Sequence, residues 1–332
     1  MDLTRNMRAV KRLVNKRTWY KEARLFYLQV LRGGNARAYM TYAYYRFLVR
    51  RRIRAAKRPL DLVPTDDAYS IHLLCSHQDV GMLLWAIASW CAQVPQTGQI
   101  YVHEDGTFTD EDRALIARVL PKVRIIDLAW ATEQARTVWL TTFPNARRQR
   151  EAYQKYVFII KLIDPLFVSS APARLILDTD ILWFAEPTEL LSRLHEHKTP
   201  FMQFCALRRS ASRDSEEGSM AGFTFTDGTQ LDPSIHTLNS GIVGYHVEEY
   251  VLADLETFCG KIDFSTPFHF YEQVGYGWIL SRHTMLSTLE ADTYVIREPV
   301  QETTIARHYT GPRRDLFSSE GVRLLCDRIL GK

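Results

Sequence analysis

The sequence Leu-Ile-Leu-Asp-Thr-Asp at residues 175–180 joins a short apolar segment to two acids spaced by one residue. Residues 174–177 are typical of a buried strand at the centre of a parallel sheet. Carboxylates at the mouth of such a strand need compensation, and two of them can hold a divalent cation that in turn binds a diphosphate. We therefore expect Asp178 and Asp180 to be metal or phosphate ligands. A strand-end turn with hydrogen-bonded acids stays open as the alternative.

A second pair of acids with the same spacing, Asp110 and Asp112, shows that the spacing alone is not specific. These acids follow Thr109, a good N-cap residue, and open a predicted helix over residues 110–120. Acids are favourable in the first turn of a helix because they oppose its dipole, so no bound cation is needed to explain them.

The pattern around residues 175–180 predicts an α/β fold, with a mainly parallel, Rossmann-like mixed sheet and right-handed crossovers. In such sheets ligands bind beyond the carboxyl ends of the strands. A Ser-, Gly- and Asp-rich segment over residues 208–234 predicts a mobile loop. We predict strands at 70–75, 99–103, 123–128, 174–177, 181–184, 237–246 and 293–297, and helices at 80–91, 110–120, 151–167, 186–197 and 269–283.

Composition and charge divide the 332 residues into two parts. Residues 1–58 carry 17 Lys and Arg against 2 acids, whereas residues 59–332 carry 25 against 36. The expected organisation is a basic helical arm followed by one catalytic domain. No apolar run of eighteen residues predicts a membrane-spanning helix, and the five scattered cysteines form no CxxC pair, so we expect a reduced, cytoplasmic chain.

The basic arm predicts two helices, over residues 7–32 and 36–57, separated by Gly33 and Gly34, with Asn35 as the N-cap of the second. Three partners remain open for it. A basic helix with an aromatic edge can lie on an anionic inner-membrane surface. The tyrosines can instead pack on the body or on another copy, and nucleic acid is the least favoured partner. The stripes in question are Tyr39, Tyr42 and Tyr45, with Arg46, Arg50 and Arg54 beside them.

Five short motifs follow one another along the chain: Lys161 in the helix before the acid pair, Asp178-Thr179-Asp180, Asn239-Ser240-Gly241, Glu272-Gln273, and His308 followed by Gly311 and Arg314. Together they resemble the GT-A nucleotide-sugar glycosyltransferases, and are similar above all to the retaining group that includes glycogenin and the bacterial lipooligosaccharide galactosyltransferases. The resemblance spans residues 69–317. Glu272 stands where the family has Asp, and Arg314 stands where it has Lys.

The resemblance implies roles for these residues. The metal, Mn²⁺ or else Mg²⁺, would be held by Asp178, Asp180 and His308, and the mixed oxygen and nitrogen ligands suit Mn²⁺ better. Catalytic roles are implied for Gln273, Glu272 and Asn239. The expected nucleotide-sugar contacts are Ser76 and Asp79 after the first strand, then Lys161, Asp178, Thr179, Ser240, Gly241, Gly311 and Arg314. Four structural alternatives stay open: a salt bridge of Lys161 to Asp164, a purely structural His308, a strand bulge at Asn239-Ser240-Gly241, and a surface position for Glu272.

The expected function is transfer of a sugar from a nucleotide sugar, most simply a UDP-sugar, to a glycan or lipid-linked glycan, with retention of configuration. Arm residues near an anionic membrane would each add about 1 kcal/mol of attraction. The alternative is a non-catalytic module that binds a nucleotide or glycan and is recruited by the arm. Other nucleotide and hydrolase motifs, such as GxxxxGK[ST], GxGxxG and HExxH, do not occur.

Overall fold

A computed structural model describes residues 23, 26–32, 34, 36–55, 63–196, 199–205, 223–265 and 268–331. The first predicted arm helix and the first part of the predicted loop at 208–234 lie mostly outside these residues. Within the described part of the chain, no helix is both long and apolar enough to cross a membrane.

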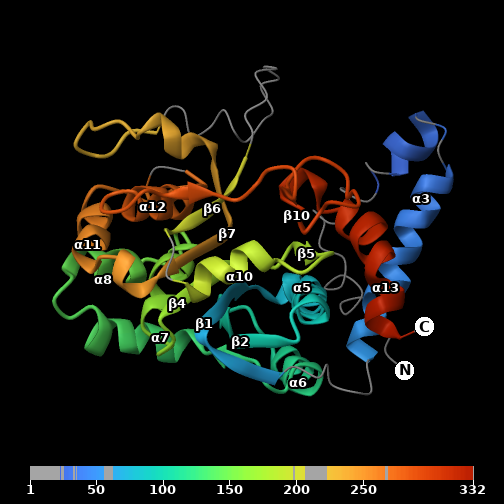
Figure 1. Ribbon diagram of the computed structural model, residues 1–332, viewed down its shortest axis with the longest axis horizontal. Helices are drawn as coiled ribbons and strands as arrows, with labels where there is room; N and C mark the ends of the chain where they lie inside the picture. Colours follow the sequence, from blue (N-terminus) through green and yellow to red (C-terminus); the bar gives the residue numbers. More distant parts are fainter. Residues whose placement is uncertain are drawn as a thin grey trace, which may run out of the picture.

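The centre of the molecule is a seven-stranded mixed sheet with the order β3-β2-β1-β4-β7-β6-β8 (Figure 1). The first four strands in this order are parallel to one another, whereas β7 runs antiparallel to both β4 and β6. The predicted α/β fold with a mainly parallel sheet is thus confirmed. The strands are β1 (Val63–Cys75), β2 (Gln96–Glu104), β3 (Arg124–Ile126), β4 (Ala173–Leu177), β6 (Phe201–Phe204), β7 (Leu238–His246) and β8 (Ser287–Thr288).

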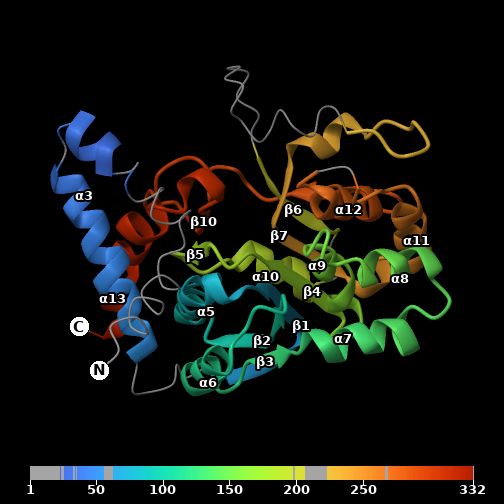
Figure 2. The same cartoon turned by 180° about the vertical axis from the view of Figure 1, so that it is seen from behind.

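Helices cover both faces of this sheet, which makes three layers (Figure 2). Thr109 caps α6, and the Asp112 side chain accepts a hydrogen bond from the Thr109 backbone N–H, so the second acid pair has the helix-capping place expected for it. The main helices are α3 (Ala36–Ala43), α4 (Arg50–Arg52), α5 (Val80–Gln93), α6 (Asp110–Val119), α7 (Leu128–Gln134), α8 (Pro144–Glu151), α9 (Ile159–Ile163), α10 (Thr188–His195), α11 (Leu252–Gly260), α12 (Tyr271–Leu280) and α13 (Arg323–Leu330).

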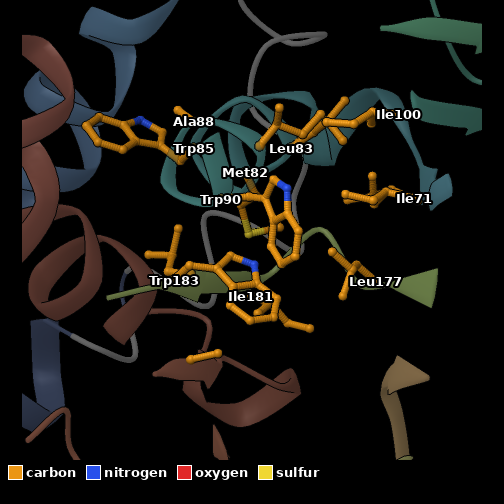
Figure 3. Close-up of a cluster of buried hydrophobic side chains, with 14 of the residues drawn as sticks. Ile71, Met82, Leu83, Trp85, Ala88, Trp90, Ile100, Leu177, Ile181 and Trp183 are labelled. Carbon is orange, nitrogen blue, oxygen red and sulfur yellow. The ribbon is translucent and has the colours of Figure 1, made fainter. Parts of the chain in front are cut away.

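Strand β4 is buried along its whole length because its alternating side chains enter two different cores. Leu175 and Leu177 pack with α5, whereas Ile176 packs with the helices of the opposite face. Figure 3 shows Leu177 in the first core, beside Ile181 and Trp183 of the short strand β5 (Ile181–Trp183). Apolar contacts on both faces of the sheet therefore hold in place the short segment that carries Asp178 and Asp180.

A second, three-stranded sheet lies beside the first, with the order β5-β10-β9. Strand β5 (Ile181–Trp183) directly follows the acid pair and runs antiparallel to β10 (Ala306–His308), which is parallel to β9 (Tyr294–Val295). Trp183 packs edge-to-face on Trp90 of α5, with ring centroids 4.7 Å apart. This sheet joins the end of β4 to a segment more than a hundred residues later.

The predicted helix over residues 151–167 is wrong. The chain instead forms α8, then turns over residues 152–158, then α9 and the short 3-10 helix Asp164–Leu166. The turn segment is rich in aromatic residues, which have weak helix propensity, and Pro165 prevents α9 from continuing as a regular helix. Other element ends differ from the predicted ones by a few residues.

The second arm helix is confirmed over residues 36–55, where α3 continues through Tyr44–Val49 and α4 to the short helix Ile53–Ala55. Both views show α3 beside α13 at one end of the molecule (Figures 1 and 2). Tyr42, Val49 and Ile53 are buried, and the latter two belong to the main core. Of the alternatives left open for the arm, packing on the body holds for Tyr45, which is partly buried against the main core. The domain boundary at residues 58/59 stays a prediction.

Candidate functional site

Asp178, Asp180 and His308 come together at the carboxyl end of β4. Antiparallel pairing places His308 opposite Ile181, the residue after Asp180, and the Tyr309 backbone N–H donates to the Asp180 carbonyl at 2.9 Å. Nε2 of His308 lies 3.1 Å from Oδ1 of Asp180 and 3.4 Å from Oδ2 of Asp178. One ligand atom from each of the three side chains lies within 4.8 Å of the others, so the group could hold a metal ion.

The side-chain chemistry of this cluster fits a divalent cation. Within the described part of the chain, buried Oδ1 of Asp180 accepts no hydrogen bond of good geometry, although Nε2 of His308 lies close enough for an ion pair. A buried carboxylate oxygen without a well-formed hydrogen bond is costly. Burial by itself would lower the pKa of His308, but Asp180 and then Asp178 outweigh that effect and raise it to about 9. The two carboxylates therefore attract positive charge at this point. Two carboxylates and one imidazole form a mixed donor set for a transition-metal dication.

Two amide side chains fix the orientation of the His308 ring from the side opposite the acids. Its Nδ1 lies 3.0 Å from Oδ1 of Asn239 and 3.2 Å from Oε1 of Gln203, so Nδ1–H is the donor and Nε2 faces the acids. Gln203 is fully buried, and its Nε2 donates to the Tyr294 carbonyl at 3.1 Å. Sequence reasoning missed Gln203, although a lone amide in the apolar strand β6 was a usable signal.

Gly241 makes room for this ring. A Cβ at position 241 would lie less than 3 Å from Nδ1 and Cε1 of His308 and from Oδ1 of Asn239. Gly241 is one of the expected nucleotide-sugar contacts. The structure shows a further reason for glycine at this position: the His308 imidazole occupies the space that a side chain would need.

Lys161 is buried between two carboxylates of the site. Its Nζ lies 2.7 Å from Oδ1 of Asp178 and 2.6 Å from Oε1 of Glu272, and it donates to the Ser240 carbonyl at 3.2 Å. Burial opposes its charge, but Asp178 and Glu272 together raise the pKa of Lys161 above its usual value. The alternative salt bridge to Asp164 does not form, because Asp164 instead binds the guanidinium of Arg150.

Glu272 and Gln273 open helix α12 and are both buried, which excludes the surface position considered for Glu272. The extra methylene of glutamate lets Glu272 reach Lys161 while its Oε2 accepts from the Ser240 hydroxyl at 2.9 Å. Oε1 of Gln273 accepts from the Ser240 backbone N–H at 3.3 Å and from Nδ2 of Asn239 at 3.4 Å. The Asn-Ser-Gly segment of β7 therefore fixes both side chains.

Asp79 and Arg314 connect the turn after β1 to the acid pair. The guanidinium of Arg314 lies 3.0 Å from Oδ2 of Asp180 through Nε and 3.2 Å from Oδ1 of Asp79 through Nη1. The Ser76 hydroxyl donates to Oδ2 of Asp79 at 3.0 Å. Gly311 opens the short helix Gly311–Arg313 that leads to Arg314.

The residues expected at the site thus form one continuous set of polar contacts, from the turn after β1 to the start of α12. Thr179 is buried between the two aspartates, and within the described residues its side chain has no recorded contact with this set. Gly311 contributes only backbone. The members in spatial order are Ser76, Asp79, Arg314, Asp180, His308, Asp178, Lys161, Glu272, Ser240, Gln273 and Asn239.

No protein-family model and no curated protein sequence matches the chain. Solved structures with similar coordinates include mouse xyloside xylosyltransferase 1, at 12% identity and a TM-score of 0.47, over 74% of this chain and 98% of that one. The bifunctional glycosyltransferase WbbM matches at 13% identity and 0.48, over 81% and 52%. The galactosyltransferase LgtC, in complex with donor and acceptor sugar analogues, matches at 13% and 0.44, over 79% and 95%. These three proteins are glycosyltransferases by name, the group that the sequence motifs resemble.

Proposed function

We propose that this chain is a metal-dependent glycosyltransferase that takes its sugar from a nucleotide sugar. One observation carries the proposal: three metal-type ligands, Asp178, Asp180 and His308, lie between two cationic side chains, Lys161 and Arg314. A nucleoside diphosphate leaves a sugar readily only when its growing negative charge is neutralised. This group of side chains offers that neutralisation from the centre and from both sides.

A divalent cation bound at Asp178, Asp180 and His308 would supply Lewis-acid stabilisation of the departing diphosphate. The imidazole ligand favours Mn²⁺ over Mg²⁺. Arg314 already binds Asp180, and its planar guanidinium is suited to binding a phosphate through two hydrogen bonds. Lys161 remains charged in its buried position because its two carboxylate partners outweigh the cost of burial.

The sugar end of the site lies at Gln273 and Asn239. Glu272 is held in an ion pair with Lys161, so we assign it the positioning of that lysine rather than proton transfer. Gln273, whose amide oxygen is oriented by β7, would lie under the anomeric carbon and stabilise its positive character. An acceptor hydroxyl that attacks from the side of the leaving group would then give retention. The donor is proposed to be a UDP-sugar and the acceptor a glycan.

Release of UDP from UDP-glucose or UDP-galactose tests this proposal. We expect release with Mn²⁺ and its suppression by a chelator, and a drop of about 100-fold or more in Asp180→Asn, because loss of one electrostatic group at a reacting centre has effects of that size. Asp110→Asn is the matched control, since it alters the exposed first acid of the other pair and should keep the wild-type rate. Release that persists unchanged in Asp180→Asn would falsify the metal assignment. Tight UDP binding without turnover of any nucleotide sugar would instead support the non-catalytic module.

The outer face of the arm helix suits an anionic membrane surface, and we propose that it docks there, beside a lipid-linked acceptor. Met40 and Leu48 are 67% and 59% exposed, and Tyr44 and Phe47 lie between them in sequence and are also exposed. Residues 36–55 contain six arginines and no acid. Apolar side chains flanked by arginines can enter a lipid interface while the guanidinium groups meet phosphates.

Sedimentation with phosphatidylglycerol vesicles tests the docking face. The double variant Met40→Glu/Leu48→Glu should lose most of its binding, because two carboxylates replace apolar contacts and repel the anionic lipid. Met285→Glu changes a methionine on the body that is more exposed, at 77%, and should sediment like the wild type. Equal sedimentation of all three proteins would exclude this face.

A further inference from the structure

The inner end of the arm helix lies on the first turn of α5, next to the candidate site. A Cβ at Gly81 would lie 3.4 Å from Nε and Nη2 of Arg50 and 3.5 Å from Nη2 of Arg54, so both guanidinium groups meet at this point. The Arg50 backbone is fixed there, since its carbonyl accepts from the indole N–H of Trp85 at 3.0 Å. The end of the blue arm helix is visible near α5 and α6 in Figure 1.

Positive charge is in excess at this junction. Burial lowers the pKa of Arg50 to about 10, and the charges of Arg46, Arg54 and Arg314 act in the same direction. Asp79 is the acid with the largest opposing effect, and its carboxylate is already paired with Arg314. The N-terminus of α5 adds the positive end of a helix dipole. Grouped cations that are partly removed from water are costly unless an anion joins them.

This junction is continuous with the candidate site. Arg314 bridges Asp79 on the junction side and Asp180 on the metal side. We infer that Arg50 and Arg54 of the arm, with Arg314 of the body, form a phosphate-binding site, and that its ligand is the diphosphate of the nucleotide donor. The inference rests on the proposed function. It makes the arm part of the donor site, not only a surface anchor.

The geometry favours phosphate over other anions. Guanidinium groups donate paired, charge-assisted hydrogen bonds that match phosphate oxygens. Arg314 can keep one donor face toward Asp180 and turn the other toward a ligand, while Arg50 is held in place by Trp85 and by the ring of Phe317, whose centroid lies 5.6 Å from its guanidinium carbon. A diphosphate would relieve the mutual repulsion of the three arginines.

Calorimetric binding of uridine, UMP, UDP and inorganic pyrophosphate to the full chain with Mn²⁺ tests the inference. Arg50→Gln and Arg54→Gln should each weaken the binding of UDP and of pyrophosphate by about 10- to 100-fold, the range for hydrogen bonds to charged groups. The affinity for uridine should not change. Arg51→Gln and Arg52→Gln are the matched controls, because these arginines are adjacent in sequence but the guanidinium atoms nearest to Gly81 come from Arg50 and Arg54; both controls should bind UDP like the wild type. Arg50→Lys should lie between Arg50→Gln and wild type, since it keeps the charge and loses the fork.

Each outcome decides the inference. Unchanged UDP and pyrophosphate affinity in Arg50→Gln and Arg54→Gln overturns it, as does an equal loss for uridine. If these two variants keep the wild-type affinity for UDP but no longer sediment with phosphatidylglycerol vesicles, the arginines bind lipid phosphate. That result also overturns the inference. If Arg50→Gln does not fold, as shown by its thermal transition, the exposed Arg54 provides the same test. A wild-type chain that binds no UDP contradicts the proposed function, and the pyrophosphate series then still tests the three arginines.

Discussion

Lys161→Met is expected to destabilise the chain by about 3–5 kcal/mol and to abolish UDP release. The substitution leaves Asp178 and Glu272 close together without their shared cation, and an uncompensated buried carboxylate has a cost of that order. Lys161 also holds Asp178 ionised, since its charge lowers the pKa of that acid against the effect of burial. Urea unfolding at pH 7 measures the change in the free energy of unfolding, and UDP release measures the activity.

Lys261→Met is the control for this effect. Its Nζ is 2.7 Å from a carboxylate oxygen of Asp227, the same distance as in the Lys161–Asp178 pair, but both groups are partly exposed at the surface. Exposed pairs contribute at most about 1 kcal/mol, so the control should lose little stability and no activity. Equal destabilisation by the two substitutions would show that the burial of Lys161 between two acids has no special cost.

Gly241→Ala is expected to weaken Mn²⁺ binding by about 10- to 100-fold, as is common when the groups that orient a metal ligand are disturbed. The added methyl group would overlap the His308 ring and the Asn239 amide, so the imidazole must move away from Asp180. Mn²⁺ affinity measured by electron paramagnetic resonance, without nucleotide, reports this directly. UDP release should fall in parallel.

Gly260→Ala controls for the general effect of replacing a glycine by alanine. The tightest neighbour of a Cβ there is the flexible Asn145 amide, at 3.1 Å, which can shift. We expect this variant to bind Mn²⁺ as the wild type does. If Gly241→Ala also keeps the wild-type affinity for Mn²⁺, the position of the His308 ring does not depend on the lack of a side chain at residue 241.

Local sequence patterns were sufficient for the centre of the fold. The apolar run before Asp178 predicted a buried strand, and Thr109 with Asp112 predicted a helix start, because both signals depend on neighbours in sequence. The turns at residues 152–158 differ from the predicted helix. The apolar residues there have helical spacing, but the aromatic residues among them have poor helix propensity. The exposed face of the arm depends on which side α13 covers, and no local pattern contains that information.

The candidate site also depends on contacts between residues that are distant in sequence, which local patterns do not predict. Residue chemistry alone identified the two aspartates, whereas His308 entered only through a family resemblance, since antiparallel pairing of β5 with β10 joins distant segments. The pairing of Lys161 with Glu272, and not with Asp164, could not be decided from helical spacing, because Arg150 takes Asp164 in the folded chain. Gln203 and the position of Arg50 beside Gly81 likewise follow from tertiary packing.

The pairing of β5 with β10 also has a consequence for biosynthesis. A ribosome delivers both aspartates long before it delivers the imidazole at position 308, so an incomplete nascent polypeptide presents only a two-oxygen site. At the proposed metal site, cation binding by all three side chains would therefore have to wait until β10 has been synthesised and has paired with β5.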